Sequence, residues 1–195
     1  MGKIYYIMGK SASGKDTIFK RLLEQSPKMK KIVLYTTRPI REGETDGVEY
    51  YFTNEAGLEK FRSEGKLIES RTYDTVYGPW TYATVDDGNI KIASRNYVAI
   101  GTLESYMKMK EYFGEEKVKP ILIEVDTGIR LQRALNRENM EKEPHYKEMC
   151  RRFIADEEDF SEENIKAAGI TKRYINDRLD TCFTEILNDV EDAKK

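Results

Sequence analysis

The chain is poor in the residues from which several common kinds of site are built. Its 195 residues include one histidine, His145, and two cysteines, Cys150 and Cys182. These numbers argue against a multi-histidine metal site and a histidine-based triad, and the cysteine spacing fits neither a zinc motif nor a disulfide framework. No apolar run is long enough to span a bilayer. The first residues have the pattern of a strand rather than of a signal peptide. We therefore expect a cytoplasmic protein without membrane contact.

A large excess of charge of either sign is also missing. The chain has 33 basic and 35 acidic residues, which gives a formal net charge of −2. Both signs are interspersed along the sequence, a pattern typical of solvated helix faces. We therefore expect no nucleic-acid partner, and nothing in the composition implies a protein partner. The length suffices for one α/β domain with a full core.

The strongest signal is a glycine-rich loop near the N-terminus. It joins the apolar run Ile4–Met8, a candidate buried strand, to a helical pattern over Ile18–Leu23. The loop consists of Gly9, Lys10, Ser11, Ala12, Ser13, Gly14, Lys15, Asp16 and Thr17. Strand, Gly-x-x-x-x-Gly-Lys and helix in this order predict a phosphate-binding P-loop, in which backbone N–H groups and the helix N-terminus hold ATP phosphates and Lys15 reaches the β- and γ-phosphates. The alternative is a chance glycine-rich turn.

The residue after the P-loop lysine departs from the usual motif. A serine or threonine hydroxyl normally binds Mg²⁺ there, whereas this chain has Asp16 and places Thr17 one position later. Mg²⁺ prefers oxygen ligands and often uses one carboxylate together with phosphates and waters. We predict a Mg²⁺ site that uses Asp16 and Thr17. The alternative is that Asp16 only stabilises the positive end of the helix.

Apolar runs alternate with helical patterns along most of the chain. The candidate strands are Ile4–Met8, Asn96–Ile100 and Pro120–Val125, with weaker candidates at Ile32–Tyr35 and Thr171–Ile175. The candidate helices are Leu103–Phe113, Ile129–Arg137, Cys150–Asp159 and Asp177–Val190. This alternation predicts an α/β fold with a five-stranded parallel sheet flanked by helices.

Two segments interrupt the alternation. Residues Thr36–Tyr82 are rich in tyrosine, threonine and glycine and contain short extended runs, so we predict a small, mostly antiparallel insert. The runs are Val48–Phe52, Leu67–Thr72 and Val76–Tyr82. Residues Asn136–His145 are polar and lie between two predicted helices, which makes this segment a candidate lid.

A second dense motif lies at the start of the insert, in residues 36–52. Arg38 and Arg41 stand close together in a proline-restricted segment, with tyrosines nearby. Each guanidinium can bind a phosphate through two parallel hydrogen bonds. Beside a P-loop, the pair predicts a pocket for a dianionic monophosphate. The alternative is an exposed loop with two solvated arginines.

The motif Thr-Thr-Arg-x-x-Arg-x-Gly-Glu-x-x-Gly-x-x-Tyr-x-Phe, which residues 36–52 match at every fixed position, resembles that of the guanylate kinase family. Weaker matches follow in the expected order across nearly the whole chain. They are Leu67-Ile68-Glu69, Tyr77-Gly78, Arg133-x-x-x-Arg137, Arg151-Arg152 and Ile175-Asn176-Asp177. The resemblance implies one domain over residues 1–195, with a core at about 1–33, 84–135 and 160–195. It also implies a monophosphate-binding insert at about 34–83 and a helical lid at about 136–159.

The resemblance also implies a reaction and residue roles. The reaction is phosphoryl transfer from ATP to GMP with Mg²⁺. The monophosphate would be held by Arg38, Arg41, Tyr50 and Tyr77, and its base by Glu69. The catalytic set would be Lys15, Arg38, Arg133, Arg137 and Arg152. Asn176 would lie near the adenine. Positioning and charge neutralisation by such residues are what phosphoryl transfer requires.

Four positions depart from the family pattern. Leu34 and Pro79 stand where hydroxyl residues are usual, and Ala99 and Gly101 where carboxylates are usual. A base site that loses hydrogen-bonding partners is expected to discriminate less or differently, so another purine monophosphate or relaxed specificity stays open beside GMP. Asp16 is a candidate replacement for the carboxylate missing at Ala99. A non-catalytic binding module is the less favoured alternative, since the P-loop lysine and lid arginines are present.

Overall fold

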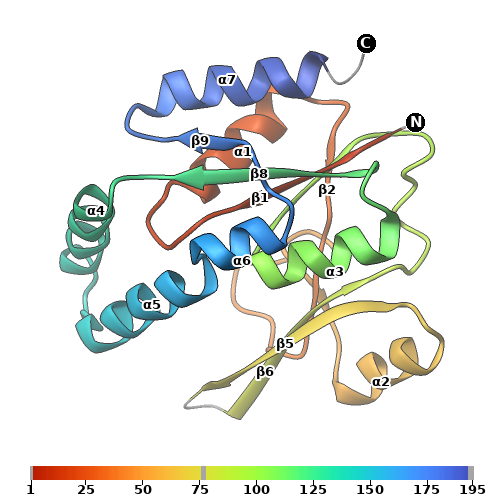
Figure 1. Cartoon of the computed structure of the whole chain (residues 1–195). Helices are drawn as coiled ribbons and strands as arrows, with labels where there is room; N and C mark the ends of the chain where they lie inside the picture. The colour runs from red at the N-terminus through yellow and green to blue at the C-terminus, as the bar shows by residue number, and fades with distance from the viewer. Residues whose placement is uncertain (1, 76–77, 193–195) are drawn as a thin grey trace.

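The computed structural model describes residues 2–75 and 78–192, which form two sheets surrounded by helices (Figure 1). The first sheet has five strands in the order β2-β7-β1-β8-β9, and every pair in it is parallel. Its strands are β1 Ile4–Met8, β2 Lys30–Lys31, β7 Tyr97–Gly101, β8 Val118–Glu124 and β9 Arg173–Ile175. The predicted five-stranded parallel sheet is confirmed.

The central strand β1 is buried along its whole length because helices cover both faces of the sheet. Ile4, Tyr6 and Met8 point to one side, where they pack with α3 (Leu103–Phe113). Tyr5 and Ile7 point to the other side, where the core includes α1 (Lys15–Gln25) and α7 (Leu179–Asp192). Alternate side chains of one strand thus supply two cores.

The second sheet contains β3 Tyr35–Thr36, β4 Tyr51–Phe52, β5 Leu67–Thr75 and β6 Gly78–Val85, in the order β4-β3-β6-β5. β3 and β5 pair antiparallel with β6, whereas β3 and β4 run parallel. The helix α2 (Glu55–Ser63), which the sequence pattern did not predict, packs Leu58 on this sheet. Asn54 begins this helix by accepting a hydrogen bond from Gly57 N at 2.9 Å.

The prediction of one strand over Ile32–Tyr35 is wrong. The chain pairs with the parallel sheet at β2 and leaves it after Ile32, whose N–H still bonds Val98 O at 2.9 Å. It then joins the second sheet at β3, next to Leu34, whose carbonyl accepts from Tyr51 N. The apolar run therefore crosses from one sheet to the other rather than forming a strand of its own.

Three helices, α4 (Thr127–Asn139), α5 (Tyr146–Asp159) and α6 (Glu162–Ala167), follow β8. In Figure 1 they run from the left edge of the molecule, at α4, back towards its centre, at α6. α4 begins before the predicted residue because Asp126 Oδ1 accepts hydrogen bonds from the N–H groups of Gly128 and Ile129. α5 also begins earlier than predicted, and the short α6 was not predicted. None of the helices in residues 2–75 and 78–192 is long and apolar enough to cross a membrane.

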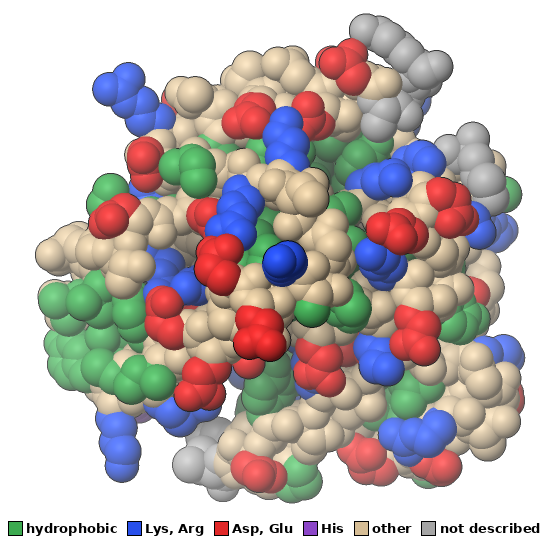
Figure 2. Space-filling view, in the orientation of Figure 1, with side chains coloured by type: hydrophobic (Ala, Val, Ile, Leu, Met, Phe, Trp, Pro, Cys, Tyr) green, Lys and Arg blue, Asp and Glu red, His purple; other side chains and the backbone are tan. Residues whose placement is uncertain are grey.

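Charges of both signs alternate over the face shown in Figure 2. This surface agrees with the near balance of basic and acidic residues in the sequence. Among the described residues, some exposed charges form pairs across one helix turn, such as Lys108 with Glu111 and Arg151 with Glu148. Exposed pairs of this kind contribute little to stability, so the fold depends mainly on its apolar cores.

The close approach of Tyr6 to Gly101 leads to a testable prediction about packing. A Cβ atom at position 101 would lie 2.2 Å from the Tyr6 hydroxyl, and Tyr6 is buried. We expect Gly101→Ala to lower the free energy of unfolding by about 1–3 kcal/mol, because overpacking forces neighbouring groups to move. Urea unfolding measures this cost. Tyr6→Phe removes the clashing oxygen, so an equal cost of Gly101→Ala in the Tyr6→Phe background would contradict the explanation.

Candidate nucleotide-binding site

The P-loop lies at the carboxyl end of β1 and continues directly into α1. Gly14 precedes the helix with φ = 89°, and a Cβ there would lie 2.4 Å from Asn176 Nδ2. Ala12 has φ = 62°, a left-handed conformation that is costly for a residue with a side chain. Lys15 is the first residue of α1, and its ammonium lies 3.9 Å from the Asp16 carboxylate. The loop therefore has the strand–loop–helix setting that the motif predicted.

Asn176, predicted to lie near the adenine, is buried beneath the P-loop. Its Nδ2 donates a hydrogen bond to Ser13 O at 2.8 Å, and its backbone N–H bonds Glu124 O. Arg133 Nη2 donates to the backbone oxygen of Asn176 at 3.1 Å. Asn176 thus holds the P-loop through Ser13, and Arg133 in turn holds Asn176. Their contacts with the nucleotide stay predictions.

The predicted Mg²⁺ ligands Asp16 and Thr17 are both exposed in the first turn of α1. A carboxylate and a hydroxyl at this point are oxygen donors of the type that Mg²⁺ prefers. In the described part of the chain, no group of three or more His, Cys, Asp or Glu residues could hold a metal. The donor set therefore fits an ion shared with nucleotide phosphates better than an ion held by protein alone.

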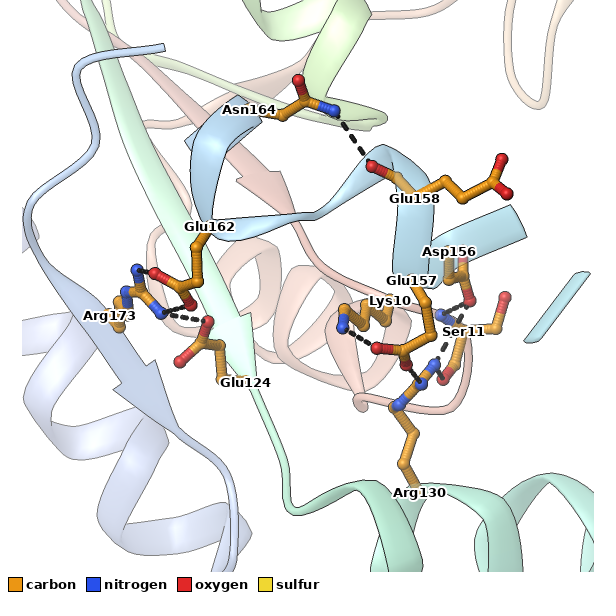
Figure 3. A network of polar contacts seen from close by, with 10 residues as sticks. All are labelled: Lys10, Ser11, Glu124, Arg130, Asp156, Glu157, Glu158, Glu162, Asn164 and Arg173. Atoms are coloured by element: carbon orange, nitrogen blue, oxygen red, sulfur yellow. Dashed lines mark hydrogen bonds and ion pairs between the residues drawn. The ribbon is translucent and has the colours of Figure 1, made fainter. Parts of the chain in front are cut away.

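The helix α5 is attached to the P-loop by two carboxylates (Figure 3). Asp156 Oδ2 accepts a hydrogen bond from the backbone N–H of Ser11 at 2.6 Å. Glu157 pairs with Lys10 Nζ at 2.6 Å. Both carboxylates also pair with Arg130, which extends from α4 towards them. The Asp156 carboxylate therefore already accepts from one backbone N–H, that of Ser11, of the anion-binding loop.

Arg130 is the basic residue that sequence analysis missed in this region. Its side chain is 1% exposed, and its guanidinium carbon lies 3.9 Å from the centre of the Phe153 ring. Burial lowers the pKa of Arg130, and the charges of Glu157 and Asp156 oppose that shift. Its position three residues before Arg133 and seven before Arg137 was a signal for one basic face of a helix.

The predicted lid arginines lie elsewhere on the same two helices. Arg137 is exposed on α4, and Arg152 Nε lies 3.6 Å from Glu148 on its own helix, α5. No hydrogen bond or ion pair joins either arginine to the P-loop among the described residues. Their action on transferring phosphates therefore stays a prediction that requires movement of the lid.

A second ion-pair cluster joins α6 to the parallel sheet beside the P-loop (Figure 3). Arg173 on β9 forms two hydrogen bonds with Glu162, at 2.7 and 2.6 Å, and a third with Glu124 on β8, at 3.0 Å. Two parallel N–H···O bonds fix direction as well as distance. The start of α6 is consequently held against the strand ends next to the nucleotide site.

In the predicted monophosphate site, Arg38 is buried and already paired. Its Nη1 and Nη2 donate to the two carboxylate oxygens of Glu44 at 2.8 and 2.6 Å. The guanidinium also lies over the rings of Tyr50 and Phe52, at 5.1 and 5.5 Å from their centres. Arg41 is exposed, and Tyr77 lies outside the described residues. Glu44 thus fixes Arg38 in a position that a phosphate could share.

The Glu44–Arg38 pair leads to a prediction about pH. The hydrogen bonds from Arg38, followed by the backbone N–H of Arg41, lower the pKa of Glu44 to about 2 from 4.5. The stability that this pair contributes should be complete above about pH 4.5 and disappear as the pH falls through 2. Carboxyl ¹³C NMR titration should show this low pKa, and Arg38→Met should raise it towards 4.5. Arg41→Met is the control, because it keeps the backbone donor; an unchanged Glu44 pKa in Arg38→Met would refute the pairing.

The predicted base-binding residue Glu69 is buried between the second sheet and α3. Its Oε1 accepts from Thr84 Oγ1 at 2.6 Å, and its Oε2 accepts from Ser105 Oγ at 3.1 Å. Arg71 Nε lies 3.3 Å from the same Oε2. The Tyr6 hydroxyl fills the space beside Gly101, where sequence analysis noted a missing carboxylate. The polar neighbours of Glu69 are therefore Thr84, Ser105 and Arg71, while its contact with a base stays a prediction.

Comparison with known proteins agrees with this geometry. The guanylate kinase family model matches residues 1–186. Curated relatives include the guanylate kinase of Symbiobacterium thermophilum, 41% identical over 78 residues, which are 40% of this chain and 37% of that protein. The guanylate kinase of Chromobacterium violaceum is 32% identical over 92 residues, or 45% and 44% of the two chains. These matches therefore span less than half the length of the curated relatives.

A solved structure shows a similar fold over a longer span. The guanylate kinase from Anaplasma phagocytophilum covers 97% of this chain and 85% of its own, with a TM-score of 0.66 and 19% sequence identity. At that identity the likeness concerns the fold alone. Because the family model spans nearly all of the sequence, the chain belongs to the guanylate kinase family.

Proposed function

We propose that this chain transfers the γ-phosphoryl group of ATP to GMP and so forms ADP and GDP. The observation that carries the proposal is the combination of a P-loop at the end of β1 with a buried, fixed Arg38 on the second sheet. One is suited to a triphosphate and the other to a monophosphate. Membership of the guanylate kinase family supports the same pairing of substrates.

On the donor side, the loop N–H groups, the start of α1 and Lys15 would hold the ATP phosphates. Lys15 can follow the negative charge that moves to the β-phosphate as the bond to the γ-phosphorus breaks. Mg²⁺, held with help from Asp16 and Thr17, would neutralise charge on the phosphate oxygens. Asp156, which accepts from Ser11 N–H, must give way wherever a phosphate oxygen takes that donor.

On the acceptor side, Arg38 would bind the monophosphate while Glu44 keeps its guanidinium in place. Arg41 and Tyr50 supply further donors beside it. A phosphate oxygen of the acceptor attacks the γ-phosphorus, and the bridging oxygen leaves with ADP. No general base is required, because that oxygen is already ionised near neutral pH.

In the lid, Arg137 and Arg152 would neutralise the transferring group after α4 and α5 move towards it. A closed lid also excludes water, which limits wasteful hydrolysis of ATP. Arg133 would act from beneath the P-loop, where it bonds Asn176 O. Each role is a matter of charge and position rather than of covalent chemistry.

A kinase of this fold with a different base preference is the second candidate. The altered residues around the base site favour it, above all Gly101, where the Tyr6 hydroxyl takes the space of a side chain. A binding module without catalysis is less favoured, because Lys15 and Arg38 both keep positions suited to phosphates.

A coupled assay of ADP release tests the proposal. ATP with Mg²⁺ is offered with GMP, dGMP, IMP, AMP, CMP or UMP in turn. Strong preference for GMP supports the first candidate, and turnover of other monophosphates supports the second. Absence of turnover with every acceptor would defeat both and favour the binding module.

A further inference from the structure

A cleft of about 650 Å³ lies between β5, the start of α3 and the helix α6. Its lining includes Arg71 and Tyr73 from β5, Thr102 and Glu104 at the start of α3, and Met107. Arg71 is the single cation among the described residues that line it. Of these five, the sequence had suggested only Glu104 as a replacement contact for the base, together with Thr84 and Ser105.

The guanidinium of Arg71 is held in place by two neighbours, and part of its hydrogen-bonding capacity stays available. Its Nη1 donates to Thr102 Oγ1 at 3.3 Å, and its Nε lies 3.3 Å from Glu69 Oε2. Its Nη2 makes no hydrogen bond to any residue that the structure describes. A guanidinium has five N–H donors in a fixed fork. Nε is buried, but Arg71 lines the cleft, and its Nη2 donors are the ones available to a ligand there.

Glu69 acts as a fixed counter-ion for this fork. Hydrogen bonds from Thr84 on β6 and Ser105 on α3 hold its two oxygens, and the residue is 8% exposed. Two hydroxyl donors therefore bond this carboxylate, and the Arg71 Nε–H is buried 3.3 Å from it without a hydrogen bond. Arg71 lines the cleft and Glu69 does not, so of this ion pair the cleft receives the guanidinium; Glu104 and Asp159 also line it.

A continuous set of contacts joins Arg71 to the monophosphate site. Arg71 lies opposite Tyr82 in the antiparallel pair of β5 and β6. The Tyr82 ring packs edge-on against Tyr50 with centres 5.6 Å apart, and Arg38 lies over Tyr50. A nucleotide with its phosphate at Arg38 can therefore extend past Tyr82 and place its base beside Arg71.

We propose that Arg71 is a specificity-determining residue that reads the O6 and N7 atoms of a 6-oxopurine monophosphate; this rests on the proposed function. Two parallel N–H groups of an arginine match these two acceptors, the commonest specific contact of arginine with guanine. Adenine places an amino donor where O6 would lie, so two donors would face each other. Pyrimidines lack the paired acceptors.

Equilibrium binding tests the proposal without relying on turnover. Isothermal titration calorimetry would compare GMP, 7-deaza-GMP, which lacks the N7 acceptor, and AMP. The protein should bind GMP about 10-fold more tightly than either, a difference of the size expected for a bidentate contact. In Arg71→Ala the difference between GMP and 7-deaza-GMP should vanish. Arg62→Ala, which removes an exposed arginine of α2, is the matched control and should keep it.

The remaining outcomes each decide the question. Arg71→Lys keeps a positive charge beside Glu69 but lacks the fork, so it should stay folded and still lose the difference. Equal binding of GMP and 7-deaza-GMP by the unaltered protein, a difference that persists in both Arg71 variants, or no binding of GMP would overturn the proposal. Failure of the proposed function has a separate signature, namely no ADP release with any monophosphate even though GMP binds with the expected pattern.

Discussion

Replacing Lys15 by methionine is expected to lower kcat for ADP formation by about 10²–10³-fold, the loss typical of one preorganised charge at a site where negative charge develops. Lys15 opens α1 directly after the P-loop glycine, and the described residues offer its ammonium one weak partner, Asp16, at 3.9 Å. That ammonium is thus available to a phosphate rather than committed to the fold. Stability should change little, because no buried ion pair is lost.

The matched control is Lys20→Met, which removes an exposed ammonium from the same helix. We expect this variant to keep the activity of the parent. Steady-state kinetics with saturating GMP and varied ATP separates the effects on kcat and KM. A Lys15→Met enzyme that raises KM for ATP while kcat stays unchanged would mean that Lys15 holds the ground state only, and the assigned catalytic role would be wrong.

The parallel sheet was predictable because its strands are short apolar runs that need no distant information. Ile4–Met8 alone contributes to two cores, and such runs between helical patterns indicate a sheet covered on both faces. The P-loop was predictable for a similar reason, since its residues are contiguous and its strand and helix are adjacent in sequence. Local chemistry decides both features.

The features that sequence analysis missed depend on contacts between distant segments. The run at Ile32–Tyr35 is apolar enough for a strand, but the chain divides it between two sheets. The helix α2 begins at an asparagine cap inside a segment that otherwise favours extended structure. The exposure of Arg71 to a cleft depends on Glu69, Thr84 and Ser105, which three separate elements supply. The hydrophobic periodicity of a single segment cannot predict contacts between residues of three different segments.

Replacing Arg130 by methionine should cost about 3 kcal/mol of the free energy of unfolding and loosen α5 from the P-loop. Arg130 is fully buried and pairs with both Asp156 and Glu157. Removing one partner of a buried pair costs about 3–5 kcal/mol, because the remaining charge is left uncompensated. The value belongs at the lower end here, since Glu157 is 43% exposed and keeps Lys10 as a partner.

Urea unfolding measures the cost, and amide hydrogen exchange of α5 reports whether the helix detaches. Arg137→Met, at an exposed site on the same helix, should cost no more than about 0.5 kcal/mol, as is usual for surface positions. Asp156→Asn combined with Arg130→Met should recover part of the loss, because the uncompensated carboxylate is then absent. If the two substitutions prove additive, Asp156 and Arg130 do not stabilise one another. The attachment of α5 would then depend on Glu157 with Lys10 and on the Ser11 N–H.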